Sequence, residues 1–328
     1  MPVRTDTIGS SEVRPEDLEQ YRRELTGHCY RMLGSGFEAD DAVQDTMVRA
    51  WRGIDSFEGR SSVRSWLYRI ATNVCLDMMR GRQRRARPMD FGPSSTADSF
   101  TGATLPEHAW VSPVPDARVL PGDGDPAEQA VLRETIRLAF VTALQHLPAR
   151  QRAVLILREV LRWQATEVAE LLETSVASVN SALQRARATL AAHDVGDTGA
   201  SQTVSADQQA LLARYVDAFE RYDINSLVSL LHDDAVMSMP PYNFWLRGPV
   251  EMGRWFLGQG SGCRGSRLVA TSANGCAAFG SYRLDTQGGH QPFALQVIEI
   301  SGDRIVGHHN FLDTNLFAAF GLPARLEP

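Results

Sequence analysis

Apolar residues recur at intervals of three and four through the first part of the chain, which is the spacing of one face of an α-helix. This pattern predicts helices over residues 38–51 and 63–85. They follow an opening helix whose inward positions are Leu18, Tyr21, Leu25 and Cys29. A helical domain is therefore predicted over residues 15–88, preceded by a flexible polar tail of residues 1–14.

The helical pattern breaks over residues 89–125, where Pro, Gly, Ser, Thr and Asp accumulate. This stretch is too long for a tight connection and predicts a flexible acidic linker. Helical spacing returns over residues 126–194, which predicts a second all-helical domain.

A short polar linker, residues 195–206, precedes a third domain over residues 207–325. Two helical segments open this domain, a strand and another helix follow, and alternating apolar and polar stretches fill the remainder. The sequence from Ser301 to Arg304 is typical of a hairpin turn. The predicted fold class is thus multidomain, with two all-α domains followed by an α+β domain that has a curved sheet.

Charge is distributed unevenly, although the whole chain carries a net charge of only −6. Residues 60–87 contain eight Arg and one acid, whereas residues 88–130 contain seven acids and one Arg. A local basic stripe of this kind favours contact with nucleic acid despite the acidic total.

The four cysteines are scattered and form no CxxC pair, which indicates reduced thiols and no metal site. No cofactor motif is apparent. No apolar run approaches the roughly 20 residues needed to cross a bilayer, and no signal peptide is visible. The expected location is the cytoplasm.

The segment around residues 165–190 has the pattern of a helix-turn-helix. Ala169 lies where two helices would cross closely, and Thr174 or Ser175 would cap the second helix. The outer face of that helix carries donors and acceptors suited to bases and phosphates in the major groove. They are Ser178, Asn180, Ser181, Gln184, Arg185 and Arg187. The alternative is a solvated polar face on a helical hairpin.

The Arg-rich helix near residues 60–87 interleaves its basic residues with Trp66 and Tyr68. Arg neutralises phosphates, aromatic rings stack on bases, and Asn73 offers a bidentate amide contact. The loop over residues 57–63 has room for a flipped base. Candidate DNA contacts are Arg60, Arg64, Asn73, Asp77, Arg80 and Arg84. The alternative is a solvated helix end in which both aromatic rings belong to the core.

Taken together, these segments resemble a known family. "EADDAVQDTMVRAWRGIDSFEGRSSVRSWLYRIATNVCLDMMRGRQRR" resembles domain 2 of the extracytoplasmic-function (ECF) sigma factors, and "LPARQRAVLILREVLRWQATEVAELLETSVASVNSALQRARATL" resembles their domain 4. The resemblance implies two partners, RNA polymerase core and promoter DNA. It implies that the polymerase is contacted by Asp41, Gln44, Asp45 and Arg49.

The same resemblance implies that Asn73, Asp77 and Arg80 lie beside the promoter element that melts. The helix-turn-helix would read a more distant upstream element, and the acidic linker would thread through the polymerase toward the RNA exit path.

The last domain resembles the SnoaL-like cone fold, related to ketosteroid isomerase and nuclear transport factor two. The resemblance implies a fused regulator, for which we expect intramolecular contact with the sigma domains. Residues expected to line a pocket, if they are not ordinary core, are Met239, Tyr242, Trp245, Trp255, His309 and Phe311. Asp233, Asp234, His308 and His309 are the candidates for acid–base chemistry, but they form no convincing catalytic set, so the chain is not expected to be an enzyme.

Two other hypotheses remain at this point. One is a repressor or activator that uses only the helix-turn-helix. The other is an enzyme of the SnoaL class that carries a DNA-binding appendage. For the last domain by itself, small-ligand sensing or a vestigial SnoaL-type enzyme is the alternative to regulation by protein contact.

Overall fold

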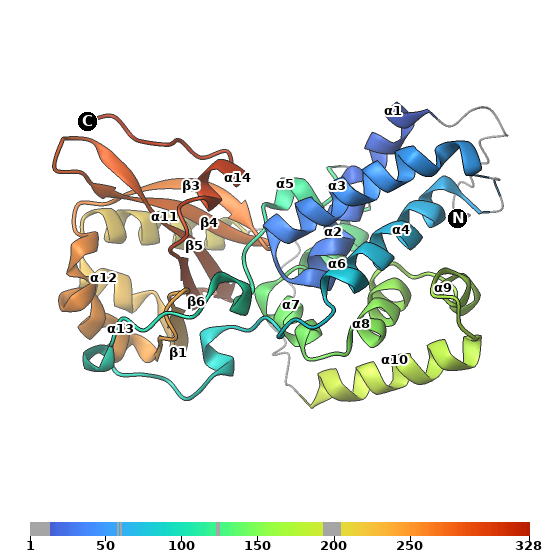
Figure 1. Ribbon diagram of the computed structural model, residues 1–328. Coiled ribbons are helices and arrows are strands. Elements are labelled where there is room, and N and C mark those ends of the chain that lie inside the picture. Colours follow the sequence, from blue (N-terminus) through green and yellow to red (C-terminus); the bar gives the residue numbers. More distant parts are fainter. Residues whose placement is uncertain (1–13, 58, 60, 123–124, 193–204) are drawn as a thin grey trace. The chain divides into compact units, whose positions relative to one another are not determined.

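The structure is a computed structural model that describes residues 14–57, 59, 61–122, 125–192 and 205–328 (Figure 1). The chain forms two compact units. The first unit contains the described residues of Met1–Gln83, Arg118–Gly122 and Ala143–Val195. The second contains those of Arg84–Ala117, Asp123–Thr142 and Gly196–Pro328.

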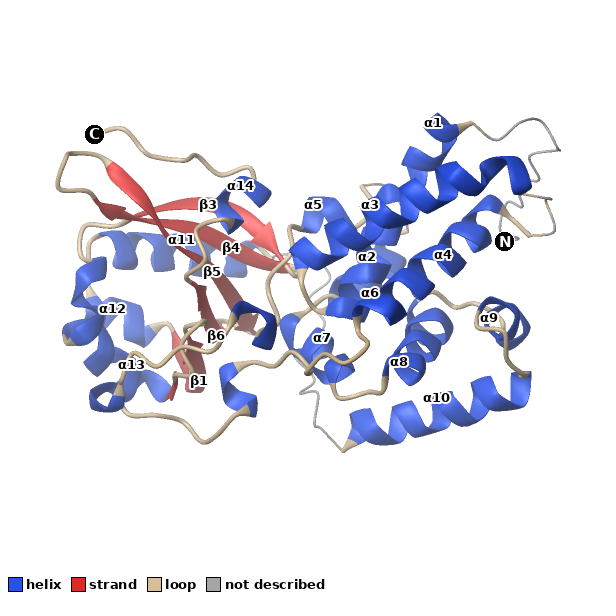
Figure 2. Ribbon diagram, in the orientation of Figure 1, coloured by secondary structure: helices blue, strands red, loops and turns tan. Residues whose placement is uncertain are grey.

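The first unit is helical throughout its regular elements (Figure 2). Its helices are α1 (Pro15–Leu18), α2 (Arg22–Leu33), α3 (Gly36–Gly53), α4 (Val63–Met78), α8 (Ala149–Leu155), α9 (Ala165–Leu171) and α10 (Val176–Ala191). Short 3-10 turns cover Glu19–Tyr21 and Ile54–Ser56, and a π-turn covers Ile156–Val160. α5 (Asp116–Val119) and α7 (Leu138–Gln145) contain points where the chain passes between the units.

The predicted apolar spacing forms the core of this unit. Leu18, Leu25 and Cys29 are buried, as are Ala42 and Val43 of α3. α2 ends where Gly34 adopts a left-handed conformation with φ 72°, which glycine tolerates because it has no Cβ.

The third predicted helix is shorter in the structure than the expected residues 63–85, because α4 ends at Met78. Gly81 has φ 71° and breaks the helical path. The chain then becomes extended, and Ala86 donates its amide to Ala109 O at 2.8 Å. The prediction of helix beyond Met78 is therefore wrong.

The second unit contains a six-stranded sheet in the order β2-β1-β6-β5-β4-β3. β1 and β6 are parallel, and the other neighbours are antiparallel. The strands are β1 (Leu231–Ser238), β2 (Trp245–Arg247), β3 (Arg267–Ala273), β4 (Cys276–Leu284), β5 (His290–Ser301) and β6 (Arg304–Phe311). The predicted hairpin turn between Ser301 and Arg304 is confirmed.

Three helices, α11 (Ala206–Glu220), α12 (Ile224–Ser229) and α13 (Gly248–Leu257), bury their apolar faces together with the sheet. Leu211 and Phe219 of α11 join Met252 of α13 and Met237 of β1 in one cluster. A short helix, α14 (Leu316–Ala319), packs Phe317 on Tyr282. The expected fold class, helical domains followed by an α+β domain, is confirmed.

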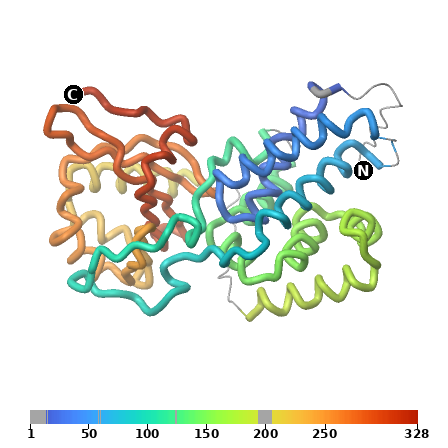
Figure 3. Tube along the Cα trace, viewed as in Figure 1, coloured from blue at the N-terminus to red at the C-terminus, as the bar shows by residue number. Residues whose placement is uncertain are grey.

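The predicted linker packs against a folded domain rather than extending into solvent. Its described residues contain 3-10 turns at Pro88–Asp90, Ala97–Ser99 and Glu107–Ala109, and the helix α6 (Pro126–Glu134) follows. The chain from 84 to 117 belongs to the unit of the sheet, and part of it runs beside β2 and α13 (Figure 3). Apolar side chains scattered among the prolines explain this course, since Trp110, Val111 and Val114 are buried.

The β3–β4 turn fixes the far end of the linker. The side chain of Asn274 accepts from Val114 N at 3.1 Å and donates to Ile136 O at 2.6 Å. Gly275 (φ 71°) donates its amide to Asp116 at 2.8 Å, and a Cβ there would lie 3.0 Å from Arg133 O. The sheet domain thus holds both the linker and the chain just beyond α6.

Candidate nucleic-acid interface

The outer face of α10 is exposed along its length. Val179, Leu183 and Ala186 are buried at intervals of four and three residues, which fixes the rotation of the helix. The predicted recognition residues are all exposed, namely Ser178, Asn180, Ser181, Gln184, Arg185 and Arg187. Arg187 also pairs with Glu159 at 2.5 Å. The arrangement offers amides, hydroxyls and guanidinium groups on one continuous surface.

The turn before α10 is built as the sequence suggests. Ser175 is the N-cap, and its hydroxyl accepts from Ser178 N at 3.1 Å. Glu173 has φ 51°, so the chain reverses sharply between α9 and α10. Ala169 is buried at the crossing. These features give α10 the position of a recognition helix in a helix-turn-helix.

A second polar surface lies on α4 and the turn that follows it. Asn73, Asp77 and Arg80 are exposed. Asp77 pairs with Arg80 at 3.0 Å and approaches Arg49 of α3 at 3.8 Å. The two surfaces predicted for DNA and for a protein partner therefore join at Asp77.

The outer face of α3 carries the other predicted contacts. Asp41, Gln44 and Arg49 are exposed and Asp45 is half-buried. Arg49 pairs with Asp45 at 2.8 Å. Trp51 lies on the same helix with 62% of its surface exposed, and the sequence reasoning missed it. An indole this exposed on a charged helix is typical of a protein-binding surface.

The remaining basic candidates differ in their surroundings. Arg64 is half-buried; it pairs with Glu24 at 2.8 Å and its guanidinium lies 5.1 Å from the Tyr68 ring centre. Arg84 is exposed. Arg60, together with most of the tail and the second linker, lies outside the described residues.

Within the first unit the amino-terminal helices pack on the helix-turn-helix. The rings of Tyr68 and Trp163 lie 5.2 Å apart, and Arg69 donates to Glu170 O at 2.8 Å. Arg152 of α8 is buried and donates to Met32 O at the end of α2 and to the Gln145 side chain. Burial lowers the pKa of Arg152 to about 10, so it stays charged at neutral pH.

The predicted pocket residues divide between two surroundings. Met239, Tyr242 and Trp255 belong to the cluster between helices and sheet. Trp245 instead donates its indole N–H to Gly92 O at 3.0 Å. His309 Nδ1 lies 2.8 Å from the Ser238 hydroxyl, and its Nε2 lies 3.4 Å from Glu299 Oε2. Phe311, on β6, is also buried outside that cluster.

Several buried polar groups of this domain contact one another. Tyr215 donates to Gln296 at 2.7 Å and lies 2.8 Å from His308 Nε2. Burial, with the neighbouring His309, lowers the pKa of His308 to about 3, so its ring is neutral. Burial alone would raise the pKa of Glu299, but nearby His309 and arginines lower it to about 2.

The acid–base candidates are not assembled into a site. Asp233 and Asp234 are exposed on β1, whereas His308 and His309 are buried on β6. Among the described residues, no cluster of His, Cys, Asp or Glu has the makings of a metal site. In the same part of the chain, none of the helices combines the length and apolar character that a bilayer crossing requires.

Comparison with known proteins identifies the family. The Sigma-70 region 2 family matches residues 18–85, and the Sigma-70 region 4 family matches residues 137–190. The ECF RNA polymerase sigma factor SigG of Mycobacterium tuberculosis is 44% identical over 313 residues, covering 94% of this chain and 83% of SigG. The chain belongs to the ECF RNA polymerase sigma factors. α2–α4 are thus part of sigma region 2, and α8–α10 are part of region 4.

Two further comparisons define how far the similarity extends. SigW of Bacillus subtilis is 28% identical over 182 residues, covering 56% of this chain and 89% of SigW. The crystal structure of M. tuberculosis SigJ is 22% identical, with a TM-score of 0.61, and the match covers 94% of this chain and 100% of SigJ. The SigJ likeness shows that the whole fold, with its carboxy-terminal domain, occurs in another sigma factor.

Proposed function

We propose that this sigma factor binds the RNA polymerase core, directs it to specific promoters, and is modulated by its own carboxy-terminal domain. The observation that carries the proposal is the exposure of polar faces on α3, α4 and α10, each opposite a buried apolar face. In this proposal the acting location is the cytoplasm, where polymerase and promoter DNA are found.

Region 4 reads the upstream promoter element through α10. Gln184 and Asn180 supply bidentate amide groups for base edges, and Arg185 supplies a guanidinium. Ser178 and Ser181 lie nearer the start of the helix, where a recognition helix enters the major groove. Region 2 contributes Asn73 and the loop before α4 at the element that melts.

Region 2 binds the polymerase through α3. Asp41 and Gln44 offer acceptors to a basic partner, and Trp51 adds an apolar contact beside them. The Asp45–Arg49–Asp77 network holds the adjoining side chains in place. The region 2 residues proposed to bind polymerase are therefore adjacent to those proposed to contact DNA.

Polymerase affinity tests this assignment. Asp41→Arg places a cation where a basic partner is proposed, and should weaken binding of the full chain to core polymerase by at least about tenfold, since like charges at an interface are costly. Asp207→Arg makes the same charge change at an exposed position of α11 and should leave the affinity unchanged. Equal affinities for the two variants would remove α3 from the interface.

The packing of region 2 on region 4 has a consequence for promoter binding. If α4 and α10 read separate promoter elements, the contacts of Trp163 with Tyr68 and of Arg69 with Glu170 must open first. The described arrangement is then the resting form. Binding to polymerase and DNA supplies the free energy that separates the two regions.

The carboxy-terminal domain acts through contact rather than catalysis. Its carboxylates on β1 face solvent, and its buried imidazole groups are engaged with Tyr215, Ser238 and Glu299. It binds the linker between regions 2 and 4 as well as the chain at Ile136. Modulation through the linker is the regulation that this geometry supports.

A further inference from the structure

One short stretch of the linker is bound by the carboxy-terminal domain as a peptide would be. Residues 92–105 run along β2, which is the edge strand of the sheet, and along the loop before it. Ser95 N donates to Trp245 O at 2.8 Å, and Leu105 N donates to Pro241 O at 3.0 Å. Backbone pairing of this kind positions an extended segment without regard to its side chains.

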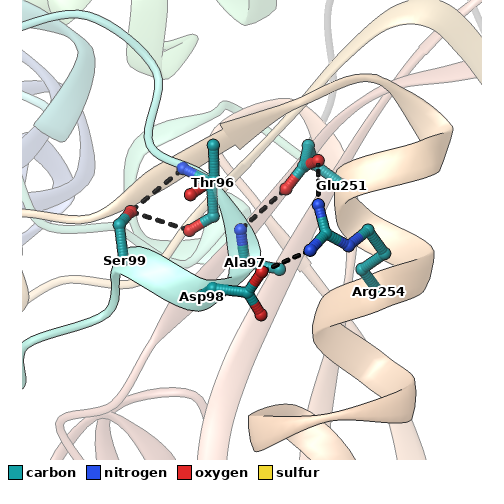
Figure 4. Close-up of polar contacts among 6 residues, drawn as sticks. All are labelled: Thr96, Ala97, Asp98, Ser99, Glu251 and Arg254. Atoms are coloured by element: carbon teal, nitrogen blue, oxygen red, sulfur yellow. Dashed lines mark hydrogen bonds and ion pairs between the residues drawn. The ribbon is translucent and has the colours of Figure 1, made fainter.

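Charged groups on α13 add selectivity (Figure 4). Glu251 accepts from Ala97 N at 2.7 Å and from Arg254 at 2.9 Å. Arg254 also contacts the carboxylate of Asp98. The turn itself is closed by Ser99, whose hydroxyl donates to Thr96 O at 2.8 Å. The carboxylate and the guanidinium of α13 thus recognise a turn that offers a free amide next to an acid.

An aromatic ring follows this turn and enters a set of three others. Phe100 lies 4.9 Å from the ring centre of Tyr242, 5.1 Å from that of Phe244 and 5.1 Å from that of Trp255, with each pair in an edge-to-face arrangement. We call Tyr242, Phe244 and Trp255 the aromatic socket. Edge-to-face pairs place the positive ring edge against the negative face and are favourable beyond apolar burial.

Another linker ring, Phe91, lies outside the aromatic socket and is more exposed. Phe91 contacts only Trp110 among the ring pairs described, at 5.5 Å, and 44% of its surface is exposed. Ala97, in contrast, is buried in the same apolar cluster that holds the socket. The linker is therefore bound most specifically at Thr96–Phe100, which we call the latch segment.

We propose that the carboxy-terminal domain carries a binding site for an acidic–aromatic peptide, and that the latch segment occupies this site in the resting protein and leaves it when the linker enters the polymerase. This inference rests on the proposed function, in which the linker threads through the polymerase. The linker cannot follow that path while Phe100 is in the socket and Ala97 N is on Glu251. Release of the latch is then a step that precedes productive polymerase binding.

The energetics predict a measurable bias. Each aromatic pair is worth a factor of about 2 to 10 in an equilibrium, so loss of three pairs should favour the released linker by at least about tenfold. The apparent affinity for the polymerase scales with the fraction of molecules in which the latch segment is released. A change that raises this fraction should therefore strengthen binding to the core polymerase. An exposed ion pair contributes less, and loss of the Asp98–Arg254 contact should shift release by at most about fivefold.

The test compares full-length variants in two measurements. Phe100→Ala should raise the rate of amide hydrogen exchange in residues 95–105 at least about tenfold. The same substitution should increase the affinity for core polymerase. Phe91→Ala removes an identical ring outside the socket and should change neither. Asp98→Asn, on an exposed side chain that cannot disturb the core, should give the same two effects at smaller size. Asp303→Asn, in the β5–β6 turn, is its matched control.

The outcomes separate the latch from the proposed function. If Phe100→Ala and Asp98→Asn leave exchange unchanged, the latch segment is not held by this site. If exchange rises but core affinity does not, the latch has no part in polymerase binding. In both cases the proposed sigma-factor function still holds, provided that the wild-type protein binds core polymerase. A wild-type protein that fails to bind the core overturns the proposed function itself.

Discussion

The contact between regions 2 and 4 can be tested at Trp163. Its side chain is 6% exposed, and its ring lies 5.2 Å from that of Tyr68. The guanidinium of Arg64 lies within 5.9 Å of the same indole and 5.1 Å of the Tyr68 ring. Trp163→Ala removes the region 4 partner of both region 2 side chains.

The magnitude follows from these contacts. An aromatic pair contributes about 0.5–1.5 kcal/mol, and a partly exposed cation–π contact contributes about 0.5–1 kcal/mol. Their loss weakens the packing of region 2 on region 4 by about 1–2.5 kcal/mol, which shifts the equilibrium toward separated regions by about 5- to 70-fold. The hydrogen bond from Arg69 to Glu170 O remains.

Distances between paired spin labels measure this equilibrium. Labels at Arg52→Cys on α3 and Ala188→Cys on α10 occupy exposed positions. Cys29, Cys75 and Cys263 are buried, and half-buried Cys276 is replaced by Ser. The distance distribution should be narrow in the otherwise wild-type protein and broad in Trp163→Ala.

Controls identify the cause of any broadening. Trp51→Ala removes an indole that is 62% exposed, and should leave the distribution narrow. Unchanged far-UV circular dichroism establishes that region 4 is still folded in Trp163→Ala. A distribution in Trp163→Ala that stays as narrow as in the wild type would refute the claim that this ring pair joins the two regions.

Three further predictions concern specificity and pH. Gln184→Ala should relax preference at single bases at a cost of about 1–3 kcal/mol, measured by binding to a set of promoter variants, and equal loss on all sequences would contradict it. Burial raises the pKa of Asp116 to about 6 from 3.8, so the folded state binds this proton more tightly and stability falls as pH rises from 4 to 6. Asp116→Asn should remove this pH dependence of the free energy of unfolding and stabilise the protein at pH 7 by about 2 kcal/mol, as measured by urea unfolding. An unchanged pH dependence would refute its assignment to Asp116. Burial, with nearby Arg31, lowers the pKa of His28 to about 3 from 6.5, so stability is lost as pH falls below 6.5, by about 2 kcal/mol at pH 5. His28→Asn should abolish this loss in the same unfolding assay.

Sequence reasoning identified the surfaces of α3, α4 and α10 because helical periodicity fixes which side faces the core. Once Val179 and Leu183 are inside, Gln184 and Arg185 must face outward. The same logic gave the α+β fold of the last domain from alternation in β5 and β6 and from the turn between them.

The sequence could not reveal how the linker binds. The apolar residues of the linker show neither helical nor strand periodicity, because the turn next to each one determines where it contacts the sheet domain. Phe100 and Ala97 are surrounded in sequence by Ser, Thr and Gly. No local pattern there predicts the contacts with Glu251 and Trp255. Trp51 was missed for a different reason, since periodicity marks buried positions and not exposed apolar ones.

Run-off transcription with purified core polymerase tests the account most directly. Templates carry candidate promoters, including the region upstream of the protein's own coding sequence. The full-length chain should give a discrete transcript from a specific start, and Gln184→Ala should redistribute preference among promoter variants. No transcript above that of core polymerase alone, on any template at low salt, would contradict the assignment of this protein as a sigma factor that initiates at promoters.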